Sequence, residues 1–243
     1  LSAKQRMLLV QGGGAHAHWW AFIAPFFTDR FDVAAIDRSG MGDSGRRDVY
    51  SSAIRAREMH AVIEDAGLGG QPFVVGHSFG GQVCRAAVLS GAPVRSLTLL
   101  GSGPAALGGH RAALVEAMRP MLLDGGVPQV WEATSVLNAA VTATQPPDVQ
   151  AFIQRRFLAS PASALLGMGE ELANAVDRTD ELAAADVPVL VACGENDDAW
   201  SPTEQQDMAR RLGARFVTFP GAGHSPAVDV PEVVAATLQK FWT

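Results

Sequence analysis

The sequence of 243 residues predicts an α/β domain: a mostly parallel, doubly wound sheet with helices on both faces and a helical insertion before the fifth strand. Two observations support this fold class. Short apolar runs rich in valine alternate with longer segments of helical spacing. The runs also lack the polar alternation of half-exposed strands, which is typical of strands buried on both faces.

Six apolar runs should form the strands, with helical segments between and after them. The predicted strands are Met7–Val10, Asp32–Ile36, Phe73–Val75, Val94–Leu100, Val187–Ala192 and Ala214–Phe219. The predicted helices are Trp19–Phe27, Ser52–Ala66, Gln82–Leu89, Thr203–Leu212 and Val230–Phe241. Pro202 fits the first turn of its helix, with Ser201 as the candidate cap. Pro231 fits the first turn of the last helix, with Asp229 as the candidate cap.

The interval from 104 to 186 breaks this alternation. It contains no convincing strand. Its Ala- and Leu-rich segments have helical spacing and are interrupted by Gly125, Pro147 and Pro161. We therefore expect one α/β core made of residues 1–103 and 187–243, with residues 104–186 inserted as a helical element over the edge or mouth of the sheet.

Composition argues against several classes of protein. The net charge is −6 and no basic stripe stands out, so we expect no nucleic-acid partner. No apolar run approaches the roughly 20 residues that span a bilayer, so we expect no membrane partner. Cys84 and Cys193 are expected to be buried thiols rather than a disulfide. No signal peptide is evident, and we expect a cytoplasmic protein acting on a small molecule; its oligomeric state has no signature in the sequence.

The stretch "FVVGHSFGGQ" places Ser78 between a predicted strand and a predicted helix, with Gly76, Gly80 and Gly81 around it. A corner this sharp strains the serine backbone and leaves no room for neighbouring side chains. Glycine removes those collisions and lets the hydroxyl stand above the edge of the sheet.

Further along the chain, an acidic cluster and a histidine follow the last two predicted strands. Glu195, Asp197 and Asp198 follow the fifth strand, and His224 follows the sixth. The carboxyl ends of parallel strands share one rim, so a serine, an acid and a histidine should meet there. That set suits nucleophilic acyl chemistry, in which the histidine takes the hydroxyl proton and the acid fixes its tautomer.

These motifs together resemble the α/β-hydrolase family over nearly the whole chain. The match rests on the Gly-His-Ser-Phe-Gly elbow at 76–80, the turn "DRSGMGDS" at 37–44, the acid segment "VPVLVACGENDD", the loop "GAGHSP" and the glycines at 12–14. The resemblance implies that 104–186 is a lid. Two departures are visible: Gln11 stands where such relatives usually carry histidine, and no antiparallel hairpin precedes Met7.

The resemblance also implies roles for individual residues. Ser78 would be the nucleophile, His224 the general base and then acid, and Asp197 the acid that orients His224, because it lies three residues past Gly194. Asp198 is the rival acid, and Glu195 is less favoured. The oxyanion would lie against the backbone amides of Phe79 and Gly13, and Gly14 is the alternative to Gly13. No metal and no organic cofactor are implied.

The expected reaction is hydrolysis of a carboxylic ester through an acyl-enzyme, with a small to medium, mostly apolar substrate. Other reactions on the same triad remain alternatives: C–C bond hydrolysis, perhydrolysis and cyanohydrin cleavage, or a non-catalytic ligand receptor. The apolar residues of the insertion that could line a pocket are Leu114, Met118, Met121, Leu122, Trp131, Leu137, Phe152 and Phe157.

Two further motifs have competing interpretations. Gly12-x-Gly14-x-x-Ala17, with Asp37 at the end of the next strand, fits the dinucleotide fingerprint of nicotinamide oxidoreductases. His16 and His18 could suggest a metal, although a third ligand is missing and loop or pocket residues are favoured. His77 is not expected to be the base, because alternation along the strand should turn it to the opposite face.

Overall fold

The computed structural model describes residues 4–65, 71–137 and 146–243 and contains one sheet of six parallel strands. Their order in the sheet is β2-β1-β3-β4-β5-β6, with every pairing parallel. The strands are β1 (Gln5–Val10), β2 (Phe31–Ile36), β3 (Phe73–His77), β4 (Ser96–Leu100), β5 (Val189–Gly194) and β6 (Arg215–Phe219). All six predicted strands are confirmed, with ends that differ by one or two residues.

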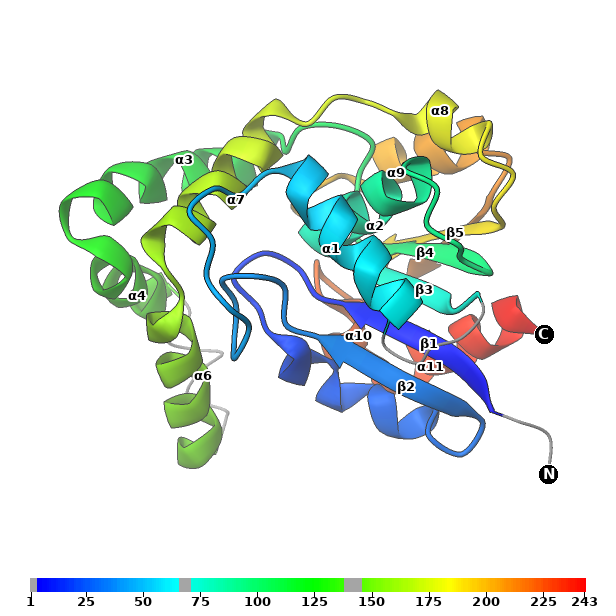
Figure 1. Ribbon diagram of the computed structural model, residues 1–243, viewed down its shortest axis with the longest axis horizontal. Helices are drawn as coiled ribbons and strands as arrows, with labels where there is room; N and C mark the ends of the chain where they lie inside the picture. Colours follow the sequence, from blue (N-terminus) through cyan, green and yellow to red (C-terminus); the bar gives the residue numbers. More distant parts are fainter. Residues whose placement is uncertain (1–3, 66–70, 138–145) are drawn as a thin grey trace.

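Helices cover both faces of this sheet, as Figure 1 shows. One face carries α1 (Ser52–Asp65), α2 (Phe79–Leu89) and α9 (Pro202–Arg211). The other carries the 3₁₀ helices η1 (Ala17–Phe22) and η2 (Ala24–Phe26), with α10 (Pro226–Asp229) and α11 (Pro231–Trp242). Each layer buries a separate apolar cluster against the sheet, because the strands present apolar side chains to both faces.

The predicted helix Trp19–Phe27 is wrong: the segment forms η1 and η2 instead. Pro25 has no N–H to donate, and the chain turns at Ile23 with bonds three residues apart. The amide of Phe26 donates to the carbonyl of Ile23 at 3.1 Å. Trp20 nevertheless lies fully buried, so the segment still contributes an apolar side chain to the core.

The two predicted caps have different outcomes. Ser201 caps α9 in a full capping box, in which its hydroxyl accepts from the Glu204 amide and the Glu204 carboxylate accepts from the Ser201 amide. Asp229 does not cap α11, because it closes the preceding short helix α10. Its carboxylate instead accepts from the amide of Gly223 at 2.9 Å, which ties down the loop before His224.

Between β4 and β5, the described residues contain five helices and no strand. They are α3 (Gly109–Asp124), α4 (Gly126–Leu137), α6 (Pro147–Ala159), α7 (Ala162–Asn174) and α8 (Thr179–Ala183). Figure 1 shows α3, α4, α6 and α7 beyond one end of the sheet, while α8 returns to contact α2 and α9.

The order of strands reverses next to β1, which pairs with β2 on one side and β3 on the other. Chain segments leaving β1 and β3 therefore diverge and open a crevice at their carboxyl ends. The glycine loop after β1 and Ser78 after β3 both lie at this crevice. The topology thus places the predicted site where open α/β sheets bind ligands.

The remaining expectations concern thiols and membranes. Cys84 and Cys193 are both free and buried, and burial raises the pKa of each thiol to about 12. Within the three described stretches, no helix combines the length and apolar character needed to cross a bilayer.

Candidate active site

Ser78 occupies the corner between β3 and α2 in a backbone conformation that serine rarely adopts. Its φ is 53° and its ψ is −125°. A Cβ on Gly76 would lie 2.6 Å from the Cα of Gly81, and a Cβ on Gly80 would lie 2.5 Å from the carbonyl oxygen of Gln11. The glycines are therefore required by close backbone approach around a strained serine.

Ser78, His224 and Asp197 lie in one hydrogen-bonded series. The Nε2 atom of His224 is 3.0 Å from the Ser78 hydroxyl oxygen, and its Nδ1 atom is 2.8 Å from Oδ1 of Asp197. With Nδ1 protonated, the imidazole donates to the carboxylate, and Nε2 is free to accept the serine proton. The three residues come from separate loops, after β3, β5 and β6.

Asp197 is buried, and its carboxylate is fully used by donors. Oδ1 also accepts from the Ala199 amide at 3.0 Å, and Oδ2 accepts from the side-chain amide of Gln205 at 3.0 Å. Burial raises the pKa of Asp197, but the hydrogen bonds from His224, Ala199 and Gln205 outweigh it and hold that pKa below the usual value. The acid therefore stays ionised at neutral pH and accepts the hydrogen bond from Nδ1 of His224.

The two rival acids do not contact His224. Asp198 is half-exposed and pairs with Arg111 at 2.6 Å. Glu195 accepts from the backbone amide of Gly221 at 2.9 Å, which ties the acid loop to the turn after β6. Of the three carboxylates in the acidic cluster, the structure brings only Asp197 to the histidine.

His77 lies beside the site rather than on the opposite face, which corrects the sequence argument. Alternation along β3 stops at His77 because the next residue, Ser78, has a positive φ. The His77 ring stacks on Trp19 at 4.3 Å and donates from Nε2 to the backbone carbonyl of His224 at 2.8 Å. Burial, and then the neighbouring His224, lower the pKa of His77 to about 3, so this ring stays neutral and its Nε2 is engaged.

The two candidate oxyanion donors flank Ser78. Phe79 is the first residue of α2, where the amide has no acceptor within its own helix. Gly13 lies in the loop after β1, and a Cβ there would overlap the sulfur of Met168 from α7. A Cβ on Gly12 would lie 3.0 Å from the Ser78 Cβ, so this loop passes directly beside the serine.

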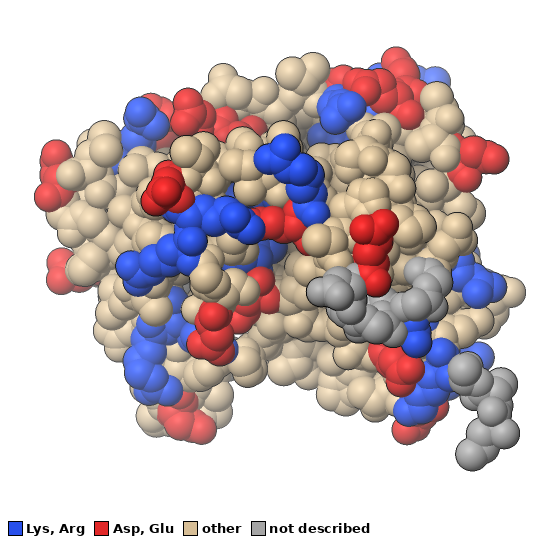
Figure 2. Space-filling view, in the orientation of Figure 1, with Lys and Arg blue, Asp and Glu red and all other residues tan. Residues whose placement is uncertain are grey.

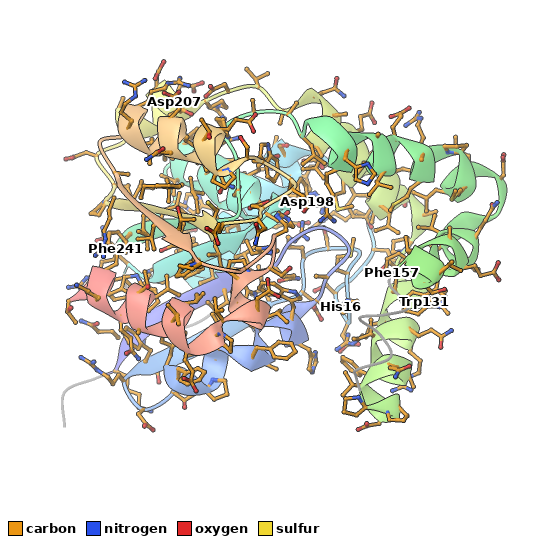
Figure 3. All side chains as sticks on the ribbon, turned by 180° about the vertical axis from the view of Figure 1, so that it is seen from behind. His16, Trp131, Phe157, Asp198, Asp207 and Phe241 are labelled. Atoms are coloured by element: carbon orange, nitrogen blue, oxygen red, sulfur yellow. The ribbon has the colours of Figure 1, made fainter. Side chains whose placement is uncertain are left out.

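Ser78 and His224 open into a cavity of about 670 Å³ between the sheet and the helices α3, α4, α6 and α7. Such a volume is typical of sites for small organic ligands. Of the apolar residues that the sequence singles out in the insertion, those that line the cavity are Leu114, Met118, Leu122, Trp131 and Phe157. Figure 3 shows Trp131 beside Phe157, with ring centroids 5.5 Å apart.

The other members of that set lie elsewhere. Met121 packs against a small buried cluster at the base of the insertion, and Phe152 contacts the ring of His18 with centroids 4.8 Å apart. The side chain of Leu137 falls outside the described residues.

Sequence reasoning missed Gln205 and Met168. Gln205 lies on the buried face of α9 with Met208 and Ala209. The sequence could have indicated it, because a polar residue occupies a position where helical spacing expects an apolar one. Met168 carried no signal in the sequence, because its contact with Gly13 joins two segments far apart in the chain.

The dinucleotide interpretation finds other uses for its residues. Asp37 accepts from the backbone amides of Ala17 at 2.7 Å and Asp43 at 3.2 Å, which joins the loop after β2 to the start of η1. The glycine loop leads into a 3₁₀ helix rather than the α-helix of a dinucleotide site.

The metal interpretation of His16 and His18 also finds no support. Nη2 of Arg156 lies 3.4 Å from Nδ1 of His18. Within the described chain, no three His, Cys, Asp or Glu side chains form a metal-binding group.

Comparison with known proteins identifies the family that the sequence motifs resemble. Residues 7–237 match the model of the Alpha/beta hydrolase family. A pimeloyl-[acyl-carrier protein] methyl ester esterase of Nitrosomonas europaea is 29% identical over 237 residues, covering 93% of this chain and 91% of that protein.

Two solved structures are also similar. A thermophilic esterase from Thermogutta terrifontis has a TM-score of 0.77 at 26% identity. The match covers 99% of this chain and 90% of the chain of that esterase. The enol-lactonase from Burkholderia xenovorans has a TM-score of 0.84 at 20% identity, covering 99% and 92%, and shares the fold. The match over residues 7–237 shows that this chain belongs to the alpha/beta hydrolase family, and it is a hydrolytic enzyme of that fold.

Proposed function

We propose that this hydrolase cleaves carboxylic esters through an acyl-enzyme on Ser78, with His224 as general base and Asp197 as its orienting acid. The observation that carries the proposal is the series of contacts at 3.0 and 2.8 Å that joins Ser78 to His224 and His224 to Asp197. A neutral imidazole held between a hydroxyl and an ionised carboxylate is the arrangement that activates serine.

The reaction follows from these positions. The Ser78 oxygen attacks the ester carbonyl carbon while Nε2 of His224 takes its proton. We expect the negative oxygen of the tetrahedral intermediate to lie against the backbone amides of Phe79 and Gly13. The imidazolium of His224 then protonates the departing alcohol, and an acyl group remains on Ser78. Water, deprotonated by His224, attacks that acyl group. The bond between the acyl carbon and the Ser78 oxygen then breaks, His224 returns the proton to that oxygen, and the acid is released.

The residues of the cavity support an acyl chain of moderate length and low polarity. The helices of 104–186 supply most of the apolar wall, and we propose that they act as the lid. Relatives named as esterases, including one that acts on a methyl ester, favour an ester over the other bonds open to this triad. The lining also includes Arg111 and Arg119 on α3, so the wall is not wholly apolar.

Nitrophenyl esters of increasing acyl length test the proposed reaction. We expect saturable release of nitrophenol, with kcat/KM rising through short and medium chains and falling once the chain outgrows the cavity. A methyl ester of a medium-chain acid, followed by acid release, serves as the unactivated substrate. Absence of turnover on every ester by the folded protein would reject the ester assignment.

Trp131→Ala should change chain-length preference more than it changes turnover of the shortest ester. Trp131 lines the cavity from α4 and contacts Phe157, so its removal enlarges the acyl wall without touching the reacting atoms. We expect the optimum to move toward longer chains, with kcat for the acetate ester within about threefold of wild type. Val136→Ala, on the same helix but 77% exposed, is the matched control. An equal slowing of all esters would mean that Trp131 does not form the acyl wall.

A further inference from the structure

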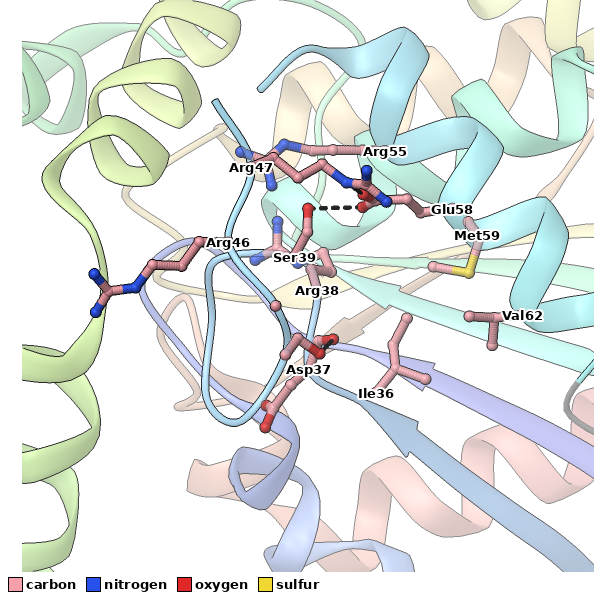
Figure 4. Close-up of a pocket in the computed structure, with 12 residues that line it drawn as sticks. Ile36, Asp37, Arg38, Ser39, Arg46, Arg47, Arg55, Glu58, Met59 and Val62 are labelled. Carbon is pink, nitrogen blue, oxygen red and sulfur yellow. Dashed lines mark hydrogen bonds and ion pairs between the residues drawn. The ribbon is translucent and has the colours of Figure 1, made fainter. Parts of the chain in front are cut away.

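A second cavity lies away from the active site, between the loop after β2 and helix α1. It has a volume of about 340 Å³ and is lined by Arg38, Ser39, Arg47, Arg55 and Glu58, among others. Figure 4 shows the guanidinium groups of Arg38 and Arg55 near each other at the back, with Glu58 turned toward Arg47. Arg46, also at its edge, extends away and donates to the carbonyl of Ala159.

Two arginines of this cavity are almost completely buried. Arg38 is 4% exposed and Arg55 is 1% exposed. Their guanidinium carbons lie 4.9 and 5.2 Å from the ring centroid of Phe79, the residue that follows the proposed nucleophile. Arg55 also lies 5.1 Å from the ring of Tyr50. Two positive charges are thus buried around one aromatic side chain.

The aromatic rings leave most of the N–H donors of these arginines without an acceptor. A ring attracts a guanidinium electrostatically, but hydrogen bonds from the guanidinium run in its own plane. Within the described residues, Nε and Nη1 of Arg38 and both Nη atoms of Arg55 have no hydrogen-bond partner. Unpaired donors on a buried charge are costly, since they lose water and gain nothing in return.

The carboxylates near these arginines are already engaged. Glu171 pairs with Nε of Arg55 at 3.0 Å, and Glu58 pairs with Arg47 and with the Ser39 hydroxyl. Asp37 accepts from the backbone amides of Ala17 and Asp43 and pairs with Arg156 at 3.5 Å. Arg38 therefore has no carboxylate partner in the described structure. Burial, and then the charge of Arg55, lower the pKa of Arg38 to about 9.

We propose that this cavity, which we call the β2–α1 cavity, binds a tetrahedral oxyanion of the phosphate class between Arg38 and Arg55. Four donor nitrogens on two guanidiniums match the oxygens of phosphate, and an anion would balance the charge of Arg38, which has no carboxylate partner among the described residues. The hydroxyl of Ser39, at the same cavity, can donate to one further oxygen if it leaves Glu58. Figure 2 shows arginine side chains grouped over this loop, although the net charge of the protein is −6.

The β2–α1 cavity is connected to the proposed reaction centre by single contacts. Nη2 of Arg38 donates to the carbonyl of Gly12 at 2.6 Å, and Gly12 borders the loop that carries Gly13. Arg38 also stacks on Phe79, whose amide is the other candidate oxyanion donor. An anion that fixes Arg38 would therefore fix both sides of that donor pair. This role is independent of which bond the enzyme cleaves.

Thermal unfolding with added phosphate tests the site at constant ionic strength, with sodium chloride as the balancing salt. We expect a saturable rise in Tm, about 3–6 °C at ten times the dissociation constant, with a smaller rise for sulfate. Arg38→Met should abolish the rise, while Arg57→Met, on the exposed side of the same helix as Arg55, should retain it. A parallel titration with glycerol phosphate shows whether the phosphoryl group of a larger molecule binds more tightly than the free ion.

Several outcomes would overturn the proposal. One is a rise in Tm with chloride equal to that with phosphate. Another is an equal rise with acetate, whose carboxylate is planar rather than tetrahedral. The third is a rise with phosphate that persists in Arg38→Met. Replacing a buried unpaired charge by an apolar chain of similar length is often tolerated. Should Arg38→Met fail to fold, Arg47→Gln provides the second variant, because its side chain is 52% exposed. Arg47→Gln frees Glu58 to compete for the buried arginines, so it should weaken phosphate binding severalfold; unchanged binding would count against the site.

Discussion

Replacing Ser78 with alanine should lower kcat by about a millionfold while leaving the protein folded. The change removes one hydroxyl at a partly exposed corner, and alanine meets the same backbone strain that serine already tolerates. His224 and Asp197 would keep their mutual contact at 2.8 Å, but no nucleophile would stand 3.0 Å from Nε2. Single-turnover and steady-state rates on a short nitrophenyl ester, with circular dichroism and Tm as folding controls, measure the effect.

Chemical labelling provides the control for that variant. A serine-directed phosphonate should modify the wild type at Ser78 and leave Ser78→Ala unlabelled. Ser102 is 1% exposed, and the Ser44 hydroxyl donates to the carbonyl of Asp37 at 2.5 Å, so neither should react. Wild-type turnover by the folded alanine variant, or label mapped to another serine, would falsify the assignment of the nucleophile.

Exchanging the two neighbouring aspartates for asparagine should give very different results. Asp197→Asn should lower kcat by about 10⁴-fold, because an amide in that position can select the imidazole tautomer that cannot accept the serine proton. Asp198→Asn should lower kcat by less than about tenfold, since Asp198 is half-exposed and pairs with Arg111 rather than with His224. The pair is matched in sequence position, size and chemical change.

The pH dependence of the two variants adds an independent measure. In Asp197→Asn the loss should be larger near neutral pH than in alkaline solution, where hydroxide partly replaces the impaired base. In wild type, the depressed pKa of Asp197 keeps its carboxylate charged through the whole neutral range, so activity should not fall from its protonation until the pH is strongly acidic. If Asp198→Asn is the crippled variant, the acid has been assigned one residue out of register; if neither is impaired, Glu195 is the next residue to test.

The sequence predicted what depends on local pattern. The strands follow from continuous apolar runs, the Ser201 cap from the first-turn proline that follows it, and the corner at Ser78 from its glycines. Each of these signals lies within about ten residues. The chain order of serine, acid and histidine could be interpreted as well, because parallel strands bring their carboxyl ends to one rim.

What depends on contacts between distant segments was not predictable in this way. Alternation along a strand placed His77 on the wrong side, because the rule ends where Ser78 turns with a positive φ. Spacing suggested a helix where Pro25 divides the segment into two 3₁₀ turns. The choice of Asp197 over Asp198 needed the resemblance to a family, because each carboxylate alone offers the same chemistry. The burial of Arg38 against Phe79 joins residues 41 positions apart and left no pattern.

The contact between Met168 and Gly13 places an oxidisable sulfur beside the proposed reaction centre. The Met168 sulfur packs against the glycine loop and lines the same cavity as Ser78, so it lies within reach of anything formed there. Thioethers are readily converted to sulfoxides, which are polar and would disturb the loop they touch. If hydrogen peroxide took the acyl group, the peracid product would be released beside this sulfur and would oxidise it. Hydrolysis forms no such oxidant, so turnover with peroxide should damage this sulfur whereas turnover with water should not.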